Sequence, residues 1–337
     1  MYRKRAILFT ISIILLALLF FTVDYNEFYR IASKLSMRWI TILVGAQLFI
    51  MLLGVIRWYI LVRRYSVSFI NVLSSSLVGL MANSLTPMNF VGGEAARAYV
   101  LSRTDRIKME DAFATVVADL FLSVIPLFLL DLLAIFLVFK HSLDIRIAWL
   151  LGIIGLFILA MVTASFNVLI NHDPSLRLFK ALLGVFKRVS VLRKYVARLE
   201  SRVDDLFMSF HRSIRTTMAD TWTLTVGMIM SVSVWVLTLF RVYMIFSALG
   251  VDVDFEVVVI VYSVLLMVSI LPLLPGALGL WEWVGTGLFT FFGIPLAAAA
   301  AAVIVDRLLF YWLPILTGFL ASLHVGLNVM KVIDKPD

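Results

Sequence analysis

The length of the apolar runs constrains this chain more than any other feature. A helix that crosses a bilayer needs about 20 mostly apolar residues, and six stretches come close to or exceed that length with few charges. These stretches are 6–23, 39–62, 112–139, 148–170, 221–247 and 297–327. Apolar residues make up 62% of the chain, against roughly 45–50% in a soluble domain. We therefore predict an all-α, polytopic transmembrane helical bundle with six full spans.

Two further apolar stretches, 69–100 and 257–292, are interrupted near the middle by proline and glycine. A helix break frees backbone polar groups, which are costly in lipid and survive only where protein or water satisfies them. We therefore predict two re-entrant helical hairpins, each shielded by the six spans. The residues that interrupt them are Pro87, Gly92, Gly93, Pro275, Gly276 and Gly279.

The basic residues are distributed unevenly between the two sides of this topology. One side receives 21 lysines and arginines and the other side 5, while Arg57, Arg241 and Arg307 lie at membrane depth. Cytoplasmic loops carry the excess of positive charge, so we predict a multi-pass cell-membrane protein with both termini in the cytoplasm. This distribution accounts for the net charge of +8 without a nucleic-acid partner.

Ten of the cytoplasmic basic residues fall within 171–217. We predict cytoplasmic amphipathic helices there, with 176–214 lying on the anionic inner leaflet. A plain basic connector is the alternative.

Each half of the chain carries the same order of arginine, proline and acidic residues. The first half has Arg57, Pro87, Glu94, Asp119 and Pro126, and the second has Arg241, Pro275, Glu282, Asp306 and Pro314. The step from proline to glutamate is seven residues in both halves, and the step from glutamate to aspartate is 25 and 24 residues. The charge distribution makes the two hairpins enter from opposite sides. We therefore predict an inverted repeat, 39–139 and 221–327, within one membrane domain spanning 1–337.

Ionisable side chains within apolar runs indicate function, because a charge at the centre of a bilayer costs at least ~2.5–3.5 kcal/mol. We expect a cavity in which arginines contact a lipid phosphate while the acids hold the arginines or exchange protons. Half-helix amino ends also favour an anion. The alternative is a set of structural ion pairs between helices. The residues concerned are Arg57, Glu94, Arg97, Asp119, Arg241, Glu282, Asp306 and Arg307. Asp131 has no counterpart in the second half, and we expect it to be paired or near the surface.

Motifs for catalysis or metal binding are absent from the sequence. The chain has no cysteine, and it contains no H-E-x-x-H, P-loop or G-x-S-x-G motif. Its four histidines are scattered. We therefore predict no metal, no cofactor, no catalytic residue and no enzymatic activity. An intramembrane enzyme that uses Glu94 or Glu282 as a base is a further hypothesis.

Three ordered segments resemble the lysylphosphatidylglycerol synthase transmembrane-region family, whose members are flippase-like integral membrane proteins. The segments 83–97, 271–282 and 306–314 read NSLTPMNFVGGEAAR, LPLLPGALGLWE and DRLLFYWLP. The resemblance extends over roughly 6–327. It implies a functional core of Pro87, Gly92, Gly93, Glu94, Arg97, Pro275, Gly276, Gly279, Glu282, Asp306 and Arg307, whereas Arg57, Asp119 and Arg241 come from the repeat.

The best-understood bacterial members fuse this region to a cytosolic aminoacyl transferase and move aminoacylated phospholipid between leaflets. This chain ends directly after its last predicted span, so we expect a stand-alone member without that transferase. The leading hypothesis is a transporter or flippase of an anionic or aminoacylated polar lipid. The alternative is a non-transporting partner or scaffold for a lipid-modifying or polyprenyl-phosphate glycosyltransferase system. A homo-oligomer is left open.

Overall fold

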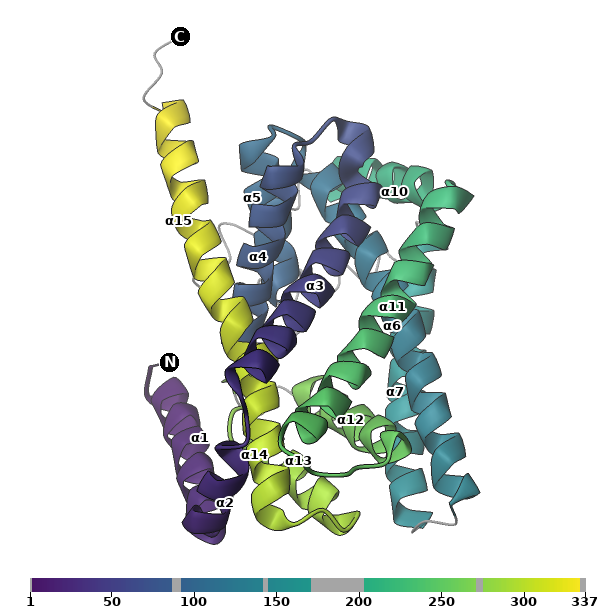
Figure 1. Ribbon diagram of the computed structural model, residues 1–337. Helices are drawn as coiled ribbons and strands as arrows, with labels where there is room; N and C mark the ends of the chain where they lie inside the picture. Colours follow the sequence, from purple (N-terminus) through teal and green to yellow (C-terminus); the bar gives the residue numbers. More distant parts are fainter. Residues whose placement is uncertain (1, 87–91, 142–144, 171–202, 271–274, 334–337) are drawn as a thin grey trace.

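The computed structural model describes residues 2–86, 92–141, 145–170, 203–270 and 275–333. Within these ranges the chain forms helices and no strand, which confirms the predicted all-α membrane bundle. The helices, drawn in Figure 1, are α1 Tyr2–Thr22, α2 Tyr25–Ala32, α3 Met37–Val62, α4 Phe69–Leu85, α5 Gly92–Thr104, α6 Met109–Lys140, α7 Ile145–Ile170, α10 Val203–Met218, α11 Thr221–Ala248, α12 Phe255–Ile270, α13 Leu280–Phe291, α14 Leu296–Arg307 and α15 Leu313–Ile333, with a short 3-10 turn η1 Arg63–Tyr65.

Four helices of the described residues are long and apolar enough to cross a membrane. They are Met37–Tyr65, Met109–Lys140, Thr221–Ala248 and Leu296–Gly326. The remaining two predicted spans are also helical, because α1 has 21 residues and α7 has 26. Side-chain caps fix where two of the long helices begin. Ser36 accepts a hydrogen bond from the N–H of Trp39 at 3.4 Å, and Asp220 accepts one from the N–H of Thr223 at 3.3 Å.

The last long helix contains a π-helical segment, η3, which spans Leu308–Trp312 between α14 and α15. Such segments interrupt the regular helical hydrogen bonding and are frequent at functional sites. Before it, α14 presents a face of small residues. Ala297 to Ala302 are each at most 2% exposed, so α13 and α2 pack closely against this helix.

The two interrupted stretches each form a pair of short helices. The first pair is α4 and α5, with 17 and 13 residues, and the second is α12 and α13, with 16 and 12 residues. Each helix is shorter than the roughly 20 residues that a full crossing needs. Figure 1 places the first pair in the upper half of the molecule and the second in the lower half. Between α12 and α13 the 3-10 turn η2, Pro275–Ala277, contacts α4, so the break of the second hairpin lies against a helix of the first.

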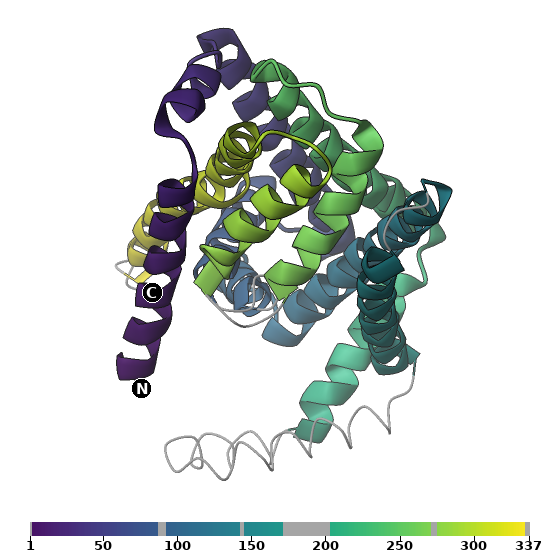
Figure 2. The same cartoon turned by 90° about the horizontal axis from the view of Figure 1, so that it is seen from below.

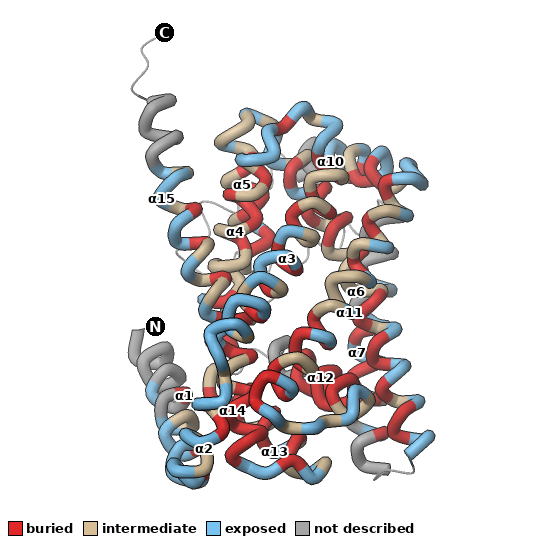
Figure 3. Tube along the Cα trace, in the orientation of Figure 1, coloured by how far each residue is buried: buried red, intermediate tan, exposed pale blue. Residues whose placement is uncertain are grey.

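The long helices surround the second hairpin when the molecule is seen from below (Figure 2). Figure 3 shows buried residues concentrated on the inward faces and exposed residues along the outer faces of α3, α7 and α15. Many exposed side chains are large and apolar, for example Trp149 at 71% and Leu156 at 68%. Extensive exposed apolar surface is rare on soluble monomers, and it is what a helix facing lipid requires.

The helix α10 covers one end of the bundle. It packs against α6, where Ile214 is completely buried, and its Ser213 carbonyl accepts a hydrogen bond from Arg64 Nη2 at 2.7 Å. This helix corresponds to the second half of the predicted segment 176–214. Residues 171–202, which include the first half, lie outside the described residues.

Candidate functional site

The predicted charged residues form two buried clusters. The first cluster consists of Arg57, Glu94, Arg97 and Asp119, and the second of Arg241, Glu282, Asp306 and Arg307. Every member is at most 9% exposed. Each cluster contains two bases and two acids, so its formal charge is zero. A buried charge is tolerated when it is paired and hydrogen-bonded, and this composition meets that condition.

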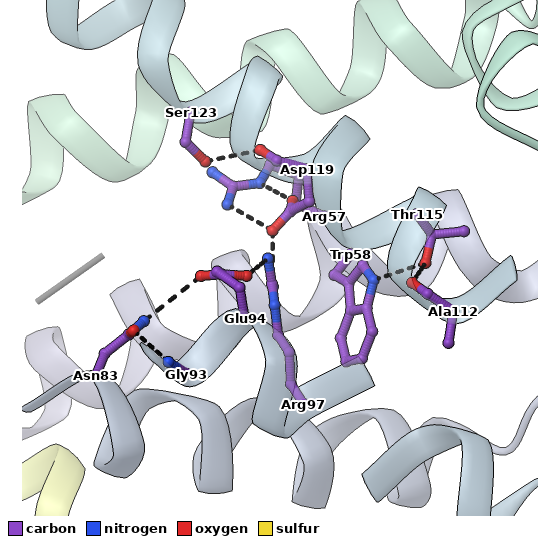
Figure 4. A network of polar contacts seen from close by, with 10 residues as sticks. All are labelled: Arg57, Trp58, Asn83, Gly93, Glu94, Arg97, Ala112, Thr115, Asp119 and Ser123. Carbon is purple, nitrogen blue, oxygen red and sulfur yellow. Dashed lines mark hydrogen bonds and ion pairs between the residues drawn. The ribbon is translucent and has the colours of Figure 1, made fainter. Parts of the chain in front are cut away.

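Asp119 of α6 is the centre of the first cluster, shown in Figure 4. Arg57 of α3 holds it bidentately, with Nε to Oδ1 at 2.6 Å and Nη2 to Oδ2 at 3.1 Å. Arg97 of α5 also donates to Oδ2, from Nη1 at 2.8 Å, and forms a second ion pair with Glu94. Asp119 therefore links the long helices α3 and α6 to the first hairpin.

The first hairpin contributes two further groups to this cluster. Asn83 accepts a hydrogen bond from the N–H of Gly93 at 2.6 Å, and its Nδ2 lies 3.5 Å from Glu94 Oε1. The Arg97 guanidinium lies 4.9 Å from the ring centroid of Trp58, a cation–π arrangement. A Cβ on Gly93 would lie 1.9 Å from the Gly79 carbonyl oxygen. The glycine is therefore required for α4 and α5 to approach each other.

The second cluster consists of two separate ion pairs. Arg241 of α11 pairs with Asp306 of α14 and also donates to the side-chain oxygen of Gln47. Arg307 donates from Nε to Glu282 Oε1 at 2.9 Å and from Nη2 to the Gly276 carbonyl. The Arg307 guanidinium lies 4.4 Å from the ring of Tyr311. These contacts join the second hairpin to the last long helix.

The amino end of α13 is occupied by the chain's own carboxylate. Gly279, with a φ of 82°, precedes the helix and donates its N–H to Glu282 Oε2 at 2.7 Å. We expected such a half-helix end to attract an anionic ligand. Here Glu282 already supplies the negative charge that the helix end favours. Gly276 also has a positive φ of 57°, which explains the glycine at that position.

The two clusters are connected through α3 and α11 by reciprocal contacts. Arg57 Nη1 of α3 donates to Ser231 Oγ of α11 at 3.1 Å, while Arg241 of α11 donates to Gln47 of α3. Early residues of each helix thus meet late residues of the other, so α3 and α11 run antiparallel. The ten-residue separation in each helix corresponds to roughly 15 Å.

Sequence reasoning missed Gln47 and Ser231. Each lies ten residues before the arginine of its own half, and this shared spacing was the available signal. Asn83 was within a recognised segment but was not selected as a candidate.

Two of the expected site residues are not described in full, and Asp131 departs from its expectation. Pro87 lies outside the described residues, and Pro275 is described only as the first residue of η2.

Asp131 is not near the surface. It is 1% exposed, and neither of its carboxylate oxygens has a hydrogen-bond partner among the described residues. Its Oδ2 lies 2.6 Å from where a Cβ on Gly155 of α7 would be, so the absence of a side chain there makes room for it.

An apolar groove of about 580 Å³ lies between α4 and the last long helix. Its walls include Met81 and Leu85 of α4, Leu308 and Trp312 of η3, and Leu316 and Phe319 of α15. No residue of either cluster lines it. The groove is bounded by the last turn of α4, which directly precedes the break of the first hairpin.

Comparisons with known proteins identify relatives over almost the whole chain. A UPF0104 membrane protein of Methanothermobacter thermautotrophicus is 32% identical over 344 residues, which cover 99% of this chain and 100% of the relative. UPF0104 membrane proteins of Pyrococcus horikoshii and Methanocaldococcus jannaschii are each 25% identical and cover 94% and 97% of this chain, with 95% and 97% of their own lengths matched. Residues 6–318 match the family described as the lysylphosphatidylglycerol synthase TM region. This chain therefore belongs to that family of membrane proteins.

Proposed function

We propose that this protein moves an anionic or aminoacylated polar lipid between the two leaflets of the cell membrane. The observation that carries the proposal is that each of the two interrupted helical hairpins contributes residues to a buried charge cluster within one membrane bundle. Family membership links the chain to lipid handling. The lipid phosphate would approach the arginines at a hairpin break while the acyl chains stay in the apolar groove beside α4.

The topology proposed for this function is an inverted repeat of 39–139 and 221–327. The antiparallel course of α3 and α11 and their reciprocal arginine contacts support it. Helices α4, α5, α12 and α13 would form re-entrant hairpins that enter from opposite sides, since each is too short to cross the membrane. Both termini would lie in the cytoplasm, with basic residues of 176–214 on the inner leaflet. Such inverted repeats place the substrate between the two halves.

The absence of native cysteine makes this topology directly testable with single introduced cysteines. Ser66→Cys and Asp105→Cys flank the first hairpin, and both should react with a membrane-impermeant maleimide only from the cytoplasmic side. Asp252→Cys, ahead of the second hairpin, should react only from the outside. Labelling of Ser66→Cys and Asp105→Cys from opposite sides would mean that the first hairpin contains one full crossing, and would refute the topology.

Transport itself is tested in liposomes that contain the purified protein and a headgroup-labelled lipid. The wild type should redistribute labelled phosphatidylglycerol between leaflets, whereas empty liposomes should not. Glu94→Gln should remain folded and lose this activity. The lipid panel should also include lysyl-phosphatidylglycerol and zwitterionic phosphatidylcholine. The proposal predicts that phosphatidylglycerol and lysyl-phosphatidylglycerol are moved in preference to phosphatidylcholine.

A second candidate function is favoured by a specific observation: all four arginines of the clusters already have carboxylate partners. Ion pairs of this kind suit a membrane scaffold for a lipid-modifying or polyprenyl-phosphate glycosyltransferase enzyme. No redistribution of any lipid in the panel, together with co-purification of such an enzyme from the native membrane, would support this function over transport.

A further inference from the structure

The two glutamates occupy equivalent places in the sequence repeat, yet their surroundings differ. Glu282 receives two hydrogen bonds, from Arg307 at 2.9 Å and from the Gly279 N–H at 2.7 Å. Glu94 has its ion pair with Arg97 and only a 3.5 Å contact from Asn83. The Glu94 side chain is 12% exposed, whereas the Glu282 side chain is 3% exposed. Among the described residues each glutamate therefore has two polar partners, but the Asn83 contact to Glu94 is longer than either hydrogen bond to Glu282, and the Glu94 side chain is the more accessible.

The elements that each ion pair connects also differ. Glu94 and Arg97 lie three residues apart on α5, so their ion pair stays within one helix. Glu282 lies on α13 and Arg307 at the end of α14, so this pair joins the second hairpin to a long span. The first hairpin is instead joined to α6 by Arg97 and Asp119, at 2.8 Å. Breaking the Glu94 pair would leave that connection in place.

The first cluster gains a positive charge when the Glu94 carboxylate moves away from Arg97. Arg57 and Arg97 then face Asp119 alone, so the cluster carries one net positive charge. Arg97 still donates to Asp119 from Nη1, while the nitrogen released from Glu94 can donate to another anion. A phosphate diester carries one negative charge and several acceptor oxygens, and arginine binds phosphate oxygens through charge-assisted hydrogen bonds. The cluster would therefore accept one phosphate group.

We propose that Glu94 is an exchangeable carboxylate which a phosphate diester displaces from Arg97, and that Glu282 is a fixed structural anchor of the second hairpin. This inference rests on the proposed function and names the side of the repeat that contacts the headgroup. The ligand chemistry is a phosphate ester in the form of a lipid headgroup. The second cluster keeps its internal ion pairs throughout, because removal of Glu282 would take away the carboxylate that accepts from both the buried Gly279 N–H and Arg307.

Binding of short-chain lipids to the purified protein tests whether Glu94 is exchangeable and Glu282 structural. The probes are dihexanoylphosphatidylglycerol, dihexanoylphosphatidylcholine and glycerol phosphate, measured by calorimetry in detergent. Glu94→Gln removes the competing carboxylate and should lower the Kd for the phosphatidylglycerol about tenfold. The phosphatidylcholine carries the same phosphate diester beside a choline cation that offsets its charge, so its Kd should fall by less. Glu282→Gln, the matched control, should leave this Kd unchanged and lower the thermal midpoint of unfolding. Should Glu282→Gln not fold, Glu256→Gln, at a partly exposed position outside both clusters, serves as the control with an unchanged Kd.

A spectroscopic readout separates headgroup contact from a structural effect. Trp58 lies against the Arg97 guanidinium and is completely buried, so its fluorescence should change when phosphatidylglycerol binds. Trp58→Phe should remove this change while calorimetric binding persists.

Several outcomes would overturn the inference. One is an unchanged Kd in Glu94→Gln, and another is an equal tightening in both glutamate variants. Glycerol phosphate binding as tightly as the short-chain lipid would assign the site to a free phosphate ester instead of a lipid. Failure of the transport proposal would give a different result. Liposomes that contain the wild-type protein would show no lipid redistribution, while Glu94→Gln would still lower the Kd about tenfold.

Discussion

The ion pair between Arg241 and Asp306 allows the energetics of the second cluster to be measured. The Arg241 side chain is completely buried and the Asp306 side chain is 6% exposed. Asp306→Leu would leave the arginine charge buried without its carboxylate partner, while the Gln47 oxygen still accepts a hydrogen bond from it. Removing one partner of a buried pair costs about 3–5 kcal/mol, and Arg241→Met should cost a similar amount because it isolates the Asp306 carboxylate.

The double variant Arg241→Met/Asp306→Leu removes both charges and should cost far less than the sum of the single changes. Gln47 then loses its partner, and an unsatisfied buried polar group costs about 1–3 kcal/mol. Equilibrium unfolding in mixed micelles with increasing dodecyl sulfate, followed by circular dichroism, measures these free energies. Val236→Leu, at a half-exposed position on the same helix, is the control and should change stability by less than about 0.5 kcal/mol. A double variant as unstable as the sum of the single variants would refute the reasoning.

Three further changes test packing and capping, each by the midpoint of thermal unfolding. Gly93→Ala places a Cβ 1.9 Å from the Gly79 carbonyl oxygen, so it should destabilise the first hairpin by about 1–3 kcal/mol or more. Gly155→Ala should destabilise the α6–α7 contact, because its Cβ meets Asp131 Oδ2, and Asp131→Ala should restore stability to the double variant. The Thr223 hydroxyl holds the pKa of Asp220 below its usual range. The cap at α11 is therefore stabilising above the ordinary carboxyl pKa and weakens as the pH falls; Asp220→Ala should remove this pH dependence, and an unchanged dependence would rule out the cap as its source.

Much of the fold could be predicted, because long apolar runs leave few alternatives. The predicted spans 39–62 and 221–247 differ from α3 and α11 by at most two residues at either end. Their beginnings were recoverable since Ser36 and Asp220 provide side-chain caps. The π segment η3 was not predicted. It lies between Arg307 and Pro314. Proline has no N–H to donate within a helix, so Pro314 was the available signal of altered hydrogen bonding.

The charged residues of the candidate site could be selected from the sequence, but their pairing could not. Matching positions in the two halves selected the charged residues, yet spacing does not say which acid meets which base. The sequence gives no sign that Arg97 would share Asp119 with Arg57, or that Glu282 would cap its own helix. Those pairings depend on how α5 and α13 are oriented against the long helices, which requires tertiary packing.

The position of one arginine in each half explains why a symmetric sequence pattern produces two different clusters. In the first half the additional arginine is Arg97, on the hairpin itself, and it reaches Asp119 on the neighbouring long helix. In the second half it is Arg307, directly after Asp306 on the long helix, and it reaches Glu282 on the hairpin. In the first half the acid of the pair that anchors the hairpin is therefore Asp119, on the long helix. In the second half it is Glu282, on the hairpin itself. Only in the first arrangement is the ion pair between hairpin and long helix independent of the hairpin glutamate.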